Sequence, residues 1–299
     1  MQPFELITLH VRGMTLPTLV SGPDDGEPVL CLHGFPDVHR TFRHQLPALG
    51  AAGYRVFAPT LPGYHPEGQH TTGRYHLATL VDDVVAMIDA VGAERIHLVG
   101  HDWGAILGYG VAAQAPERLL SLTAMAVPLP RGMVKARSRG WVQLRRSWYI
   151  AFFVALGRFA DAHVEANDWA FIERLWRTWS PAYVCPSGEM RLIKDTLGAP
   201  GVKAAALGYY RDAFELMGPR TQRAYTLFSA RLQVPTLALN GSQDGCVDPL
   251  FFTLSMEQED TLAELKLKTI PGAGHFLHLE APKVVNRILG AWLEQHHAR

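Results

Sequence analysis

Short apolar runs alternate with helical spacing over the first part of the chain. Apolar runs at 29–32, 54–58, 96–99 and 119–127 predict buried strands, because each is short and bounded by glycine or proline. Between them, the apolar residues of 77–91 recur every three or four positions, which predicts a helix with one apolar face. Strand and helix in alternation predict right-handed βαβ units and a parallel sheet.

The pattern changes after residue 128, where strand runs fade and helical spacing takes over. The segment that follows holds five of the seven tryptophans: Trp141, Trp148, Trp169, Trp176 and Trp179. We expect most of these aromatic side chains to fill the small core of a helical cap, while others face an apolar pocket. Strand patterns return at 234–239 and 265–270, before a closing helix. The predicted organisation is a first core part at 1–128, a helical cap at 129–228 and a second core part at 229–299.

The bulk composition is that of a globular protein. Hydrophobic residues make up 48% and charged residues 19%, and Lys+Arg and Asp+Glu both number 28, so the formal charge is zero. No charge run stands out, so neither nucleic acid nor an anionic membrane surface is an expected partner. Three cysteines fit a reducing compartment, and neither a secretory signal nor a membrane-spanning apolar stretch is apparent. We therefore expect a soluble, cytoplasmic protein.

The candidate nucleophile is Asp102, at the centre of the run GHDWG at 100–104. A Gly-x-nucleophile-x-Gly run directly after a strand predicts a nucleophile elbow, a strained turn that needs glycine on both sides. A carboxylate there attacks as an anion and forms an ester with an alkyl carbon, so strained or activated alkyl electrophiles are the expected substrates. The alternative is an aspartate that only caps the next helix. That helix carries Gly104, Gly108 and Gly110, so we expect it to lie very close to the sheet.

Two further residues complete a candidate catalytic triad. Asp244 and His275 each follow a predicted strand, and loops after parallel strands share one edge of the sheet. His275 would activate the water that hydrolyses an ester on Asp102, and Asp244 would orient the imidazole and stabilise its charged form. Asp248 and His278 are the rivals on the same two loops.

The run HGFP at 33–36 supplies a fourth element. It ends a predicted strand, which would direct its backbone amides towards the space above the elbow. We expect the amides of Phe35 and Trp103 to form an oxyanion hole for the tetrahedral intermediate of ester hydrolysis. The alternative for this run is an ordinary turn.

These runs, together with GSQDGC at 241–246 and GAGHF at 272–276, resemble α/β-hydrolases of the epoxide hydrolase and haloalkane dehalogenase group. The resemblance extends over nearly the whole chain. It implies the α/β-hydrolase fold, with a mostly parallel sheet, helices on both faces and an inserted helical cap. It also implies chemistry by an aspartate nucleophile without a metal or an organic cofactor.

The resemblance ranks epoxide hydrolysis first, because two cap segments are similar to the tyrosine segments of epoxide hydrolases. It implies that Tyr149 and Tyr210 bind the substrate and assist ring opening, with Tyr209 as the rival in register. Haloalkane dehalogenation ranks second, with the indole of Trp103 as a substrate-binding halide donor, and a non-catalytic ligand-binding protein ranks third. The expected partners are a small apolar epoxide and water, with neither nucleic acid nor membrane, and a homodimer is left open.

Overall fold

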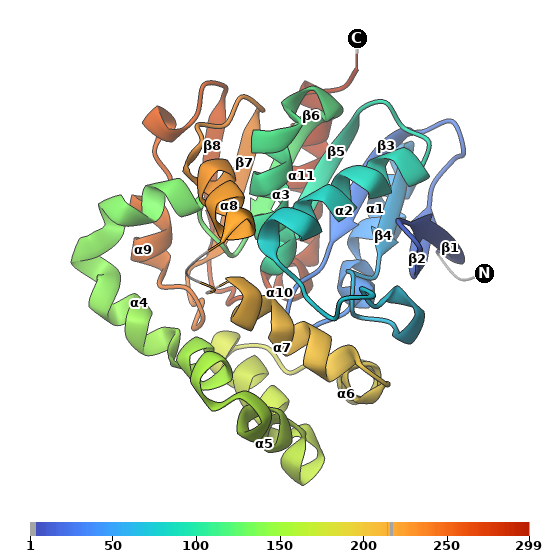
Figure 1. The fold of residues 1–299 in the computed structure, drawn as a ribbon. Helices are drawn as coiled ribbons and strands as arrows, with labels where there is room; N and C mark the ends of the chain where they lie inside the picture. Colours follow the sequence, from blue (N-terminus) through green and yellow to red (C-terminus); the bar gives the residue numbers. More distant parts are fainter. Residues whose placement is uncertain (1–3, 214, 216–217, 299) are drawn as a thin grey trace.

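One eight-stranded sheet forms the centre of the computed structural model, which describes residues 4–213, 215 and 218–298 (Figure 1). The strand order is β1-β2-β4-β3-β5-β6-β7-β8. The strands are β1 (Glu5–Val11), β2 (Met14–Ser21), β3 (Glu27–Leu32), β4 (Tyr54–Pro59), β5 (Ile96–His101), β6 (Leu119–Met125), β7 (Thr236–Gly241) and β8 (Leu265–Ile270). All pairs from β4 to β8 are parallel, as predicted. The antiparallel pairing of β1 with β2, and of β2 with β4, was not predicted.

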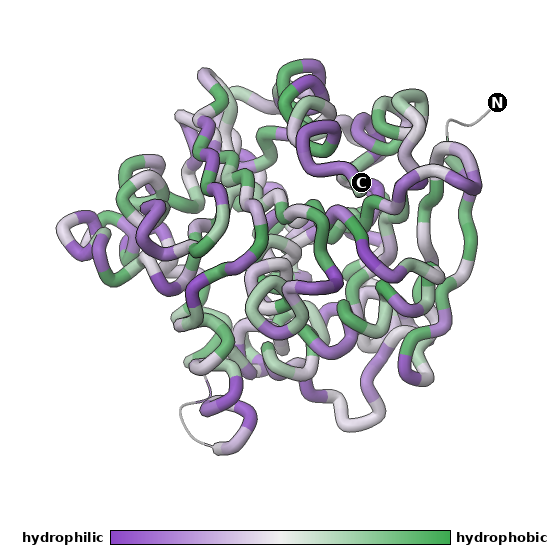
Figure 2. The backbone as a smooth tube through the Cα atoms, turned by 90° about the horizontal axis from the view of Figure 1, so that it is seen from above, coloured by the Kyte–Doolittle hydropathy of each residue, from purple (hydrophilic) through white to green (hydrophobic). Residues whose placement is uncertain are grey.

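Helices cover both faces of the sheet and bury two apolar layers. On one face, α1 (Gln45–Ala51) and α11 (Pro282–Gln295) pack against side chains such as Val29 and Val99. On the other, α2 (Leu77–Ala90) and α3 (Trp103–Gln114) pack against Leu30 and Leu98. Because successive side chains of a strand point to opposite faces of the sheet, neighbouring residues of β3 and β5 lie in different apolar layers. Figure 2 shows hydrophobic segments running through the middle of the molecule.

Between β6 and β7, all the described secondary-structure elements are helices. These elements are η4 (Pro130–Arg139), α4 (Gly140–Arg146), α5 (Trp148–Trp179), α6 (Ser187–Gly198), α7 (Val202–Ala213) and α8 (Pro219–Ser229). The helix α5 is interrupted at Gly157 and again at 166–169, where the backbone leaves helical geometry. Most of this insertion lies beside the carboxyl ends of the strands (Figure 1). The division at 128 and 228 stays a prediction, and its second boundary falls inside α8.

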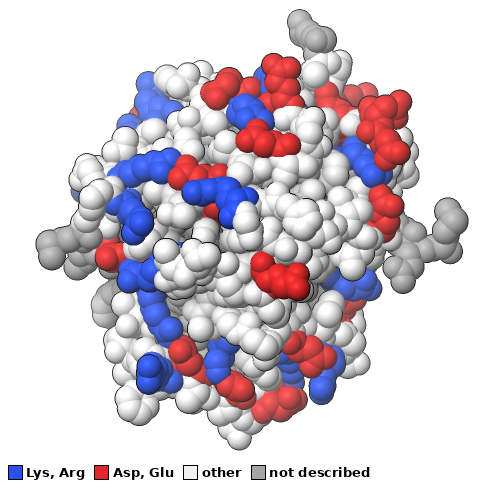
Figure 3. Space-filling model, turned by 45° about the vertical axis from the view of Figure 1, so that its right-hand side comes forward, with Lys and Arg blue, Asp and Glu red and all other residues white. Residues whose placement is uncertain are grey.

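Short elements complete the chain. They are η1 (His39–Phe42), η2 (Pro66–Gly68), η3 (Pro116–Arg118), α9 (Pro249–Leu254), η5 (Gln258–Asp260) and α10 (Leu277–Glu280). None of the described helices is long and apolar enough to cross a lipid bilayer. On the face drawn in Figure 3, Lys and Arg side chains are interspersed with Asp and Glu around large uncharged areas.

The tryptophans of the insertion divide into two groups. Trp169, Trp176 and Trp179 are buried, as expected for aromatic side chains that fill a small core. Trp141 and Trp148 are 72% and 41% exposed, so the expectation that they fill the core or face a pocket is wrong for Trp141 and only partly met by Trp148. Their helices form an outer edge of the molecule (Figure 1), and the ring of Trp148 is partly covered by Phe171 and Arg174 from the later part of α5.

Candidate active site

Asp102 occupies a tight turn between β5 and α3. Its φ of 52° lies in the left-handed region, which is unfavourable for a residue with a side chain. The turn is closed by glycine on both sides. A Cβ on Gly100 would lie 2.2 Å from the carbonyl oxygen of Gly104, and one on Gly104 would lie 2.0 Å from that of Leu32. Asp102 is also the N-cap residue of α3. The predicted elbow position and the alternative capping position are therefore the same residue.

The other two glycines of α3 have different neighbours. A Cβ on Gly108 would meet the side chain of Leu122 in β6, so this part of the helix does lie close to the sheet. A Cβ on Gly110 would meet Val81 in α2 instead. The expected close approach of the helix to the sheet is therefore confirmed at Gly104 and Gly108, while Gly110 points to another side of the helix, towards α2.

The loops after β5, β7 and β8 bring Asp102, Asp244 and His275 together. The Nδ1 of His275 lies 3.0 Å from Oδ2 of Asp244, and its Nε2 lies 3.6 Å from Oδ2 of Asp102. Asp244 is held by the backbone amides of Cys246 and Val247, which donate to its Oδ1 at 2.7 and 2.9 Å. All three triad candidates are buried. In this geometry the carboxylate of Asp244 orients the imidazole, and the imidazole faces the carboxylate of Asp102 across a gap.

The charge state of His275 follows from these two carboxylates. Burial disfavours the imidazolium, but the negative charge of Asp244, followed by that of Asp102, outweighs it and raises the pKa of His275 to about 10. The Nε2 atom is buried and has no hydrogen-bond partner within the described residues. The site therefore holds an imidazolium between two carboxylates at neutral pH, with one N–H directed towards the nucleophile candidate.

The two rival residues have other contacts. Asp248 caps α9 by accepting a hydrogen bond from the amide of Phe251, and it forms an ion pair with Arg139 at 3.0 Å. The Nε2 of His278 lies 2.6 Å from the hydroxyl of Thr41, on the far side of the triad. Neither lies against the carboxylate of Asp102, so the geometry favours Asp244 and His275 as its partners.

The HGFP run contacts the nucleophile candidate directly. The backbone amide of Phe35 donates a hydrogen bond of 2.8 Å to Oδ1 of Asp102. A Cβ on Gly34 would lie 2.4 Å from that same oxygen, so only glycine lets the loop approach so closely. The Phe35 amide thus lies where one oxyanion-hole donor is expected, and the corresponding role of the Trp103 amide stays a prediction.

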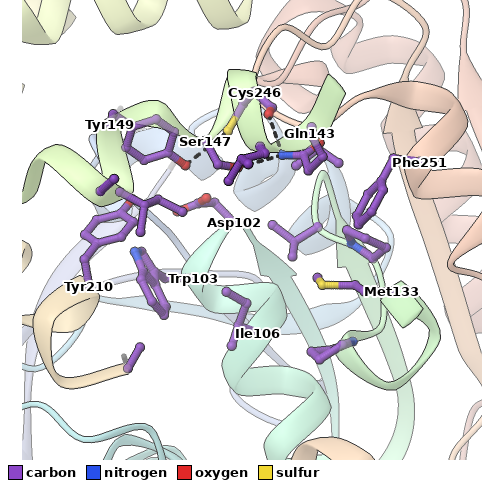
Figure 4. A pocket seen from close by; sticks show the side chains of 18 of the residues that line it. Asp102, Trp103, Ile106, Met133, Gln143, Ser147, Tyr149, Tyr210, Cys246 and Phe251 are labelled. Carbon is purple, nitrogen blue, oxygen red and sulfur yellow. Dashed lines mark hydrogen bonds between the residues drawn. The ribbon is translucent and has the colours of Figure 1, made fainter. Parts of the chain in front are cut away.

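A cavity of about 770 Å³ opens on Asp102 between the core and the insertion. Tyr149 on α5 and Tyr210 on α7 both line it, and Figure 4 shows the two rings beside Asp102. The hydroxyl of Tyr210 is buried without a partner among the described residues, and that of Tyr149 lies 3.5 Å from Sγ of Cys246. Burial raises the pKa of both tyrosines well above its ordinary value, so both hydroxyls stay protonated donors.

The neighbouring Tyr209 points elsewhere. Its hydroxyl donates to the carbonyl oxygen of Pro62 at 2.8 Å, and its ring stacks on Tyr75 with centroids 5.6 Å apart. It does not line the cavity. Of the two tyrosines that the sequence left as rivals, Tyr210 is therefore the one that faces Asp102.

Residues 27–282 match the alpha/beta hydrolase fold family. The chain belongs to that family. It is 28% identical over 290 residues to the AB hydrolase superfamily protein YfhM of Bacillus subtilis, covering 96% of each chain. It is also 28% identical over 315 residues to epoxide hydrolase A of Mycobacterium tuberculosis, covering 94% of each. The solved structure of epoxide hydrolase VrEH1 from Vigna radiata superposes with a TM-score of 0.81 at 24% identity, covering 99% of both chains. These similarities confirm the predicted fold class and family.

Several cavity residues had no signal in the sequence. Gln143 of α4 and Ser147, between α4 and α5, line the wall above Asp102, and the amide of Gln143 donates both to the Ser147 hydroxyl and to the Cys246 carbonyl (Figure 4). Cys246 follows the triad candidate Asp244 by two residues, and that proximity was the only available hint. Within the described residues, no cluster of three His, Cys, Asp or Glu side chains is arranged to hold a metal ion.

Proposed function

We propose that the protein hydrolyses epoxides to vicinal diols through a hydroxyalkyl ester on Asp102. The observation that carries this proposal is the shared cavity, in which a buried carboxylate and two protonated tyrosine hydroxyls face the same space. A leaving alkoxide needs a proton donor, and tyrosine hydroxyls serve that role. The names of the relatives, epoxide hydrolase A among them, support the same reaction.

In the first step, an oxygen of Asp102 attacks a ring carbon from the face opposite the epoxide oxygen. The carbon–oxygen ring bond breaks, and the alkoxide takes its proton from Tyr149 or Tyr210. The unpartnered hydroxyl of Tyr210 can reach the substrate without losing a protein contact, whereas Tyr149 exchanges its contact with Cys246 for one with the epoxide oxygen. The products of this step are a neutral ester and a neighbouring hydroxyl group.

Ester formation changes the properties of His275. The ester removes the negative charge of Asp102, which is one of the two charges that raise the pKa of His275. Its pKa therefore falls on alkylation, and the proton that the imidazolium loses restores the tyrosine that protonated the alkoxide, which leaves His275 neutral at the stage when a base is needed. His275, oriented by Asp244, then takes a proton from water that attacks the carboxyl carbon of Asp102. The Phe35 amide donates to the oxyanion, and the diol departs with an oxygen from Asp102.

The path of the oxygen atoms tests this mechanism. With enzyme in excess over styrene oxide in ¹⁸O-water, the diol of the first turnover should contain no label, and Asp102 should gain it. Heavy label in the first-turnover diol would overturn the ester route in favour of direct hydration by water. The Asp102→Ala variant should form no ester and should release no diol under the same conditions.

One observation favours haloalkane dehalogenation as the second candidate. The indole Nε1 of Trp103 is buried without a partner among the described residues, and the ring lines the cavity beside Asp102. An indole N–H can donate to a leaving halide, which needs no proton. Parallel assays on styrene oxide and 1-bromobutane separate the two, since diol without bromide supports epoxide hydrolysis and bromide without diol supports dehalogenation. If neither diol nor bromide forms, a ligand-binding role is favoured.

The cavity favours an apolar, uncharged epoxide. Of the side chains that line it, only Asp102 carries a charge, and most of the others are aliphatic or aromatic. Such a lining offers no partner for a charged group on the substrate, whose burial would be costly. We therefore expect hydrocarbon epoxides to bind better than epoxides that carry a carboxylate.

A further inference from the structure

The outer face of the insertion carries large apolar side chains that the fold leaves partly or largely exposed. Trp141, Leu144 and Trp148 recur at helical spacing on α4 and the start of α5, and Phe159 follows the interruption at Gly157. Phe159 is 82% exposed, Trp141 72% and Leu144 63%. We call these four side chains the apolar ridge. Exposed side chains of this size, three of them at helical spacing, indicate a surface that another apolar phase covers.

The ridge adjoins the mouth of the catalytic cavity. Leu144 belongs to both, since it lines the cavity and is also largely exposed. Gln143 of the same helix and Ser147 just after it point inward, and α4 with the start of α5 forms an outer edge of the molecule (Figures 1 and 4). A ligand that leaves an apolar phase on the ridge therefore has a short path to Asp102.

Basic residues are frequent along the segment that carries the ridge. From Leu119 to Ala160 the sequence contains seven Lys or Arg and neither Asp nor Glu, a basic stretch hidden by the balanced charge of the whole chain. Four of these seven pair with acidic residues elsewhere: Arg131, Lys135, Arg139 and Arg146. Arg137, Arg145 and Arg158 are exposed, and no ion pair joins any of them to another described residue. The cations are spread over the segment rather than gathered in one run, which agrees with the expected absence of a charge run.

The combination of charge and apolar side chains favours one partner. A second copy of the chain in a two-fold contact would bring the same unpaired arginines towards one another, which disfavours a homodimer through this face. Arginines interleaved with tryptophan and phenylalanine match the boundary of a bilayer, where phosphates attract the cations and the rings reach the acyl chains. The helix α4 is short, α5 is interrupted at Gly157, and none of the described helices is long and apolar enough to cross a bilayer, so they would lie on it.

We propose that the apolar ridge and its three unpaired arginines dock the protein on the surface of an anionic lipid bilayer. The bilayer would then present dissolved apolar molecules at the mouth of the cavity. This departs from the expectation of no membrane partner. The docking itself does not rest on the proposed reaction, because it is measured as binding and needs no turnover.

Vesicle flotation tests the docking. Wild-type protein should float with phosphatidylcholine vesicles that contain about a third phosphatidylglycerol, and it should stay unbound with phosphatidylcholine alone. About 0.5 M salt should weaken the binding, because it screens exposed charges. Each cation near such a surface contributes about 1 kcal/mol, so Arg137→Gln/Arg145→Gln/Arg158→Gln should weaken binding by about 100-fold. Trp141→Ala/Phe159→Ala should also release the protein.

A matched control removes the same charge elsewhere. Lys268, Lys283 and Arg287 are exposed on β8 and α11, away from the insertion, so their triple change to Gln should leave binding unchanged. Absence of wild-type binding to the anionic vesicles at low salt would overturn the proposal. Equal loss in the control triple would overturn it as well, since binding would then depend on overall charge. A dimer in size-exclusion chromatography that Trp141→Ala/Phe159→Ala dissociates would instead make the ridge an interface between copies.

Discussion

The sheet and the helical insertion hold their parts of the site by different forces. In the sheet, Asp102 and Asp244 accept short hydrogen bonds from backbone amides, and His275 lies between their carboxylates. In the insertion, Tyr149 and Tyr210 are held mainly by ring contacts, such as the one between Tyr210 and Trp103 at 4.9 Å. A buried charge needs fixed hydrogen-bond partners. A hydroxyl that must donate to a substrate should instead not be strongly bound to the protein.

The two regions also differ in steric tolerance. The elbow is closed by backbone atoms that would lie within 2.2 Å of a new Cβ on Gly100 or Gly104. In the insertion, a Cβ on Gly188 or Gly140 would meet no atom within 4 Å. The elbow thus depends on backbone shape, whereas Gly140 and Gly188 of the insertion have room for a side chain; Gly132 of η4, whose Cβ would lie 2.0 Å from the carbonyl oxygen of Ser255, does not. The predictions below test this contrast.

The largest effect is expected for His275→Gln. Without a base, the ester on Asp102 should form but persist, so turnover should fall on the order of 10⁴-fold. Mass spectrometry after mixing with substrate should find one equivalent of ester on the protein. The rival His278 provides the control, and His278→Gln should leave no trapped ester in the folded fraction. An unmodified His275→Gln protein would contradict the role assigned to the imidazole.

The tyrosine hydroxyls should matter less individually, because two donors share one oxygen. Tyr149→Phe and Tyr210→Phe should each slow ring opening about 10- to 100-fold, and the double variant should lose more than either, within the ~10²–10⁴-fold range of general acid catalysis. Stopped-flow measurement of ester formation reports this step directly. Tyr209→Phe is the matched control, since its hydroxyl contacts Pro62 rather than the cavity. If Tyr209→Phe slows ring opening more than Tyr210→Phe does, Tyr209 rather than Tyr210 is the donor.

The next largest effect is expected on the free energy of unfolding, which should respond differently to substitutions in the elbow and in the insertion. Gly104→Ala forces a Cβ against the carbonyl of Leu32 and should destabilise the fold by about 3 kcal/mol or more. Gly188→Ala on α6 enters open space and should leave the free energy of unfolding within about 1 kcal/mol, with a small gain from helix propensity. Urea titration measures both. Similar losses in the two variants would remove the steric contrast between elbow and insertion.

The smallest expected effect is a pH dependence of stability. The pKa of His275 is raised to about 10 in the folded protein, above its ordinary value. Its charged form therefore contributes stability that is complete below about pH 6.5 and is lost as pH rises through about 10. The difference in Tm between wild type and His275→Gln should shrink from pH 6 to pH 10. A difference that stays constant or grows would contradict the raised pKa.

The sequence by itself determined the parallel strands of the sheet, the main helices that cover it and the candidate residues at the strand ends. Strand and helix periods are local signals, which is why the parallel strands from β3 to β8 could be predicted. The Gly-x-Asp-x-Gly run around Asp102 specifies its turn by sterics within five residues. The edge hairpin of β1 and β2 was missed, because apolar residues of β1 alternate with polar ones instead of forming a continuous apolar run.

Only the tertiary structure decided how the insertion meets the core. Tyr209 and Tyr210 are neighbours on α7 and point about 100° apart, so packing against Pro62 and Trp103 selects which one faces the cavity. Likewise, composition could not tell that Trp141 is exposed while Trp179 is buried. A helix carries its periodicity in its own sequence, but the direction that each face takes depends on segments far away in the chain.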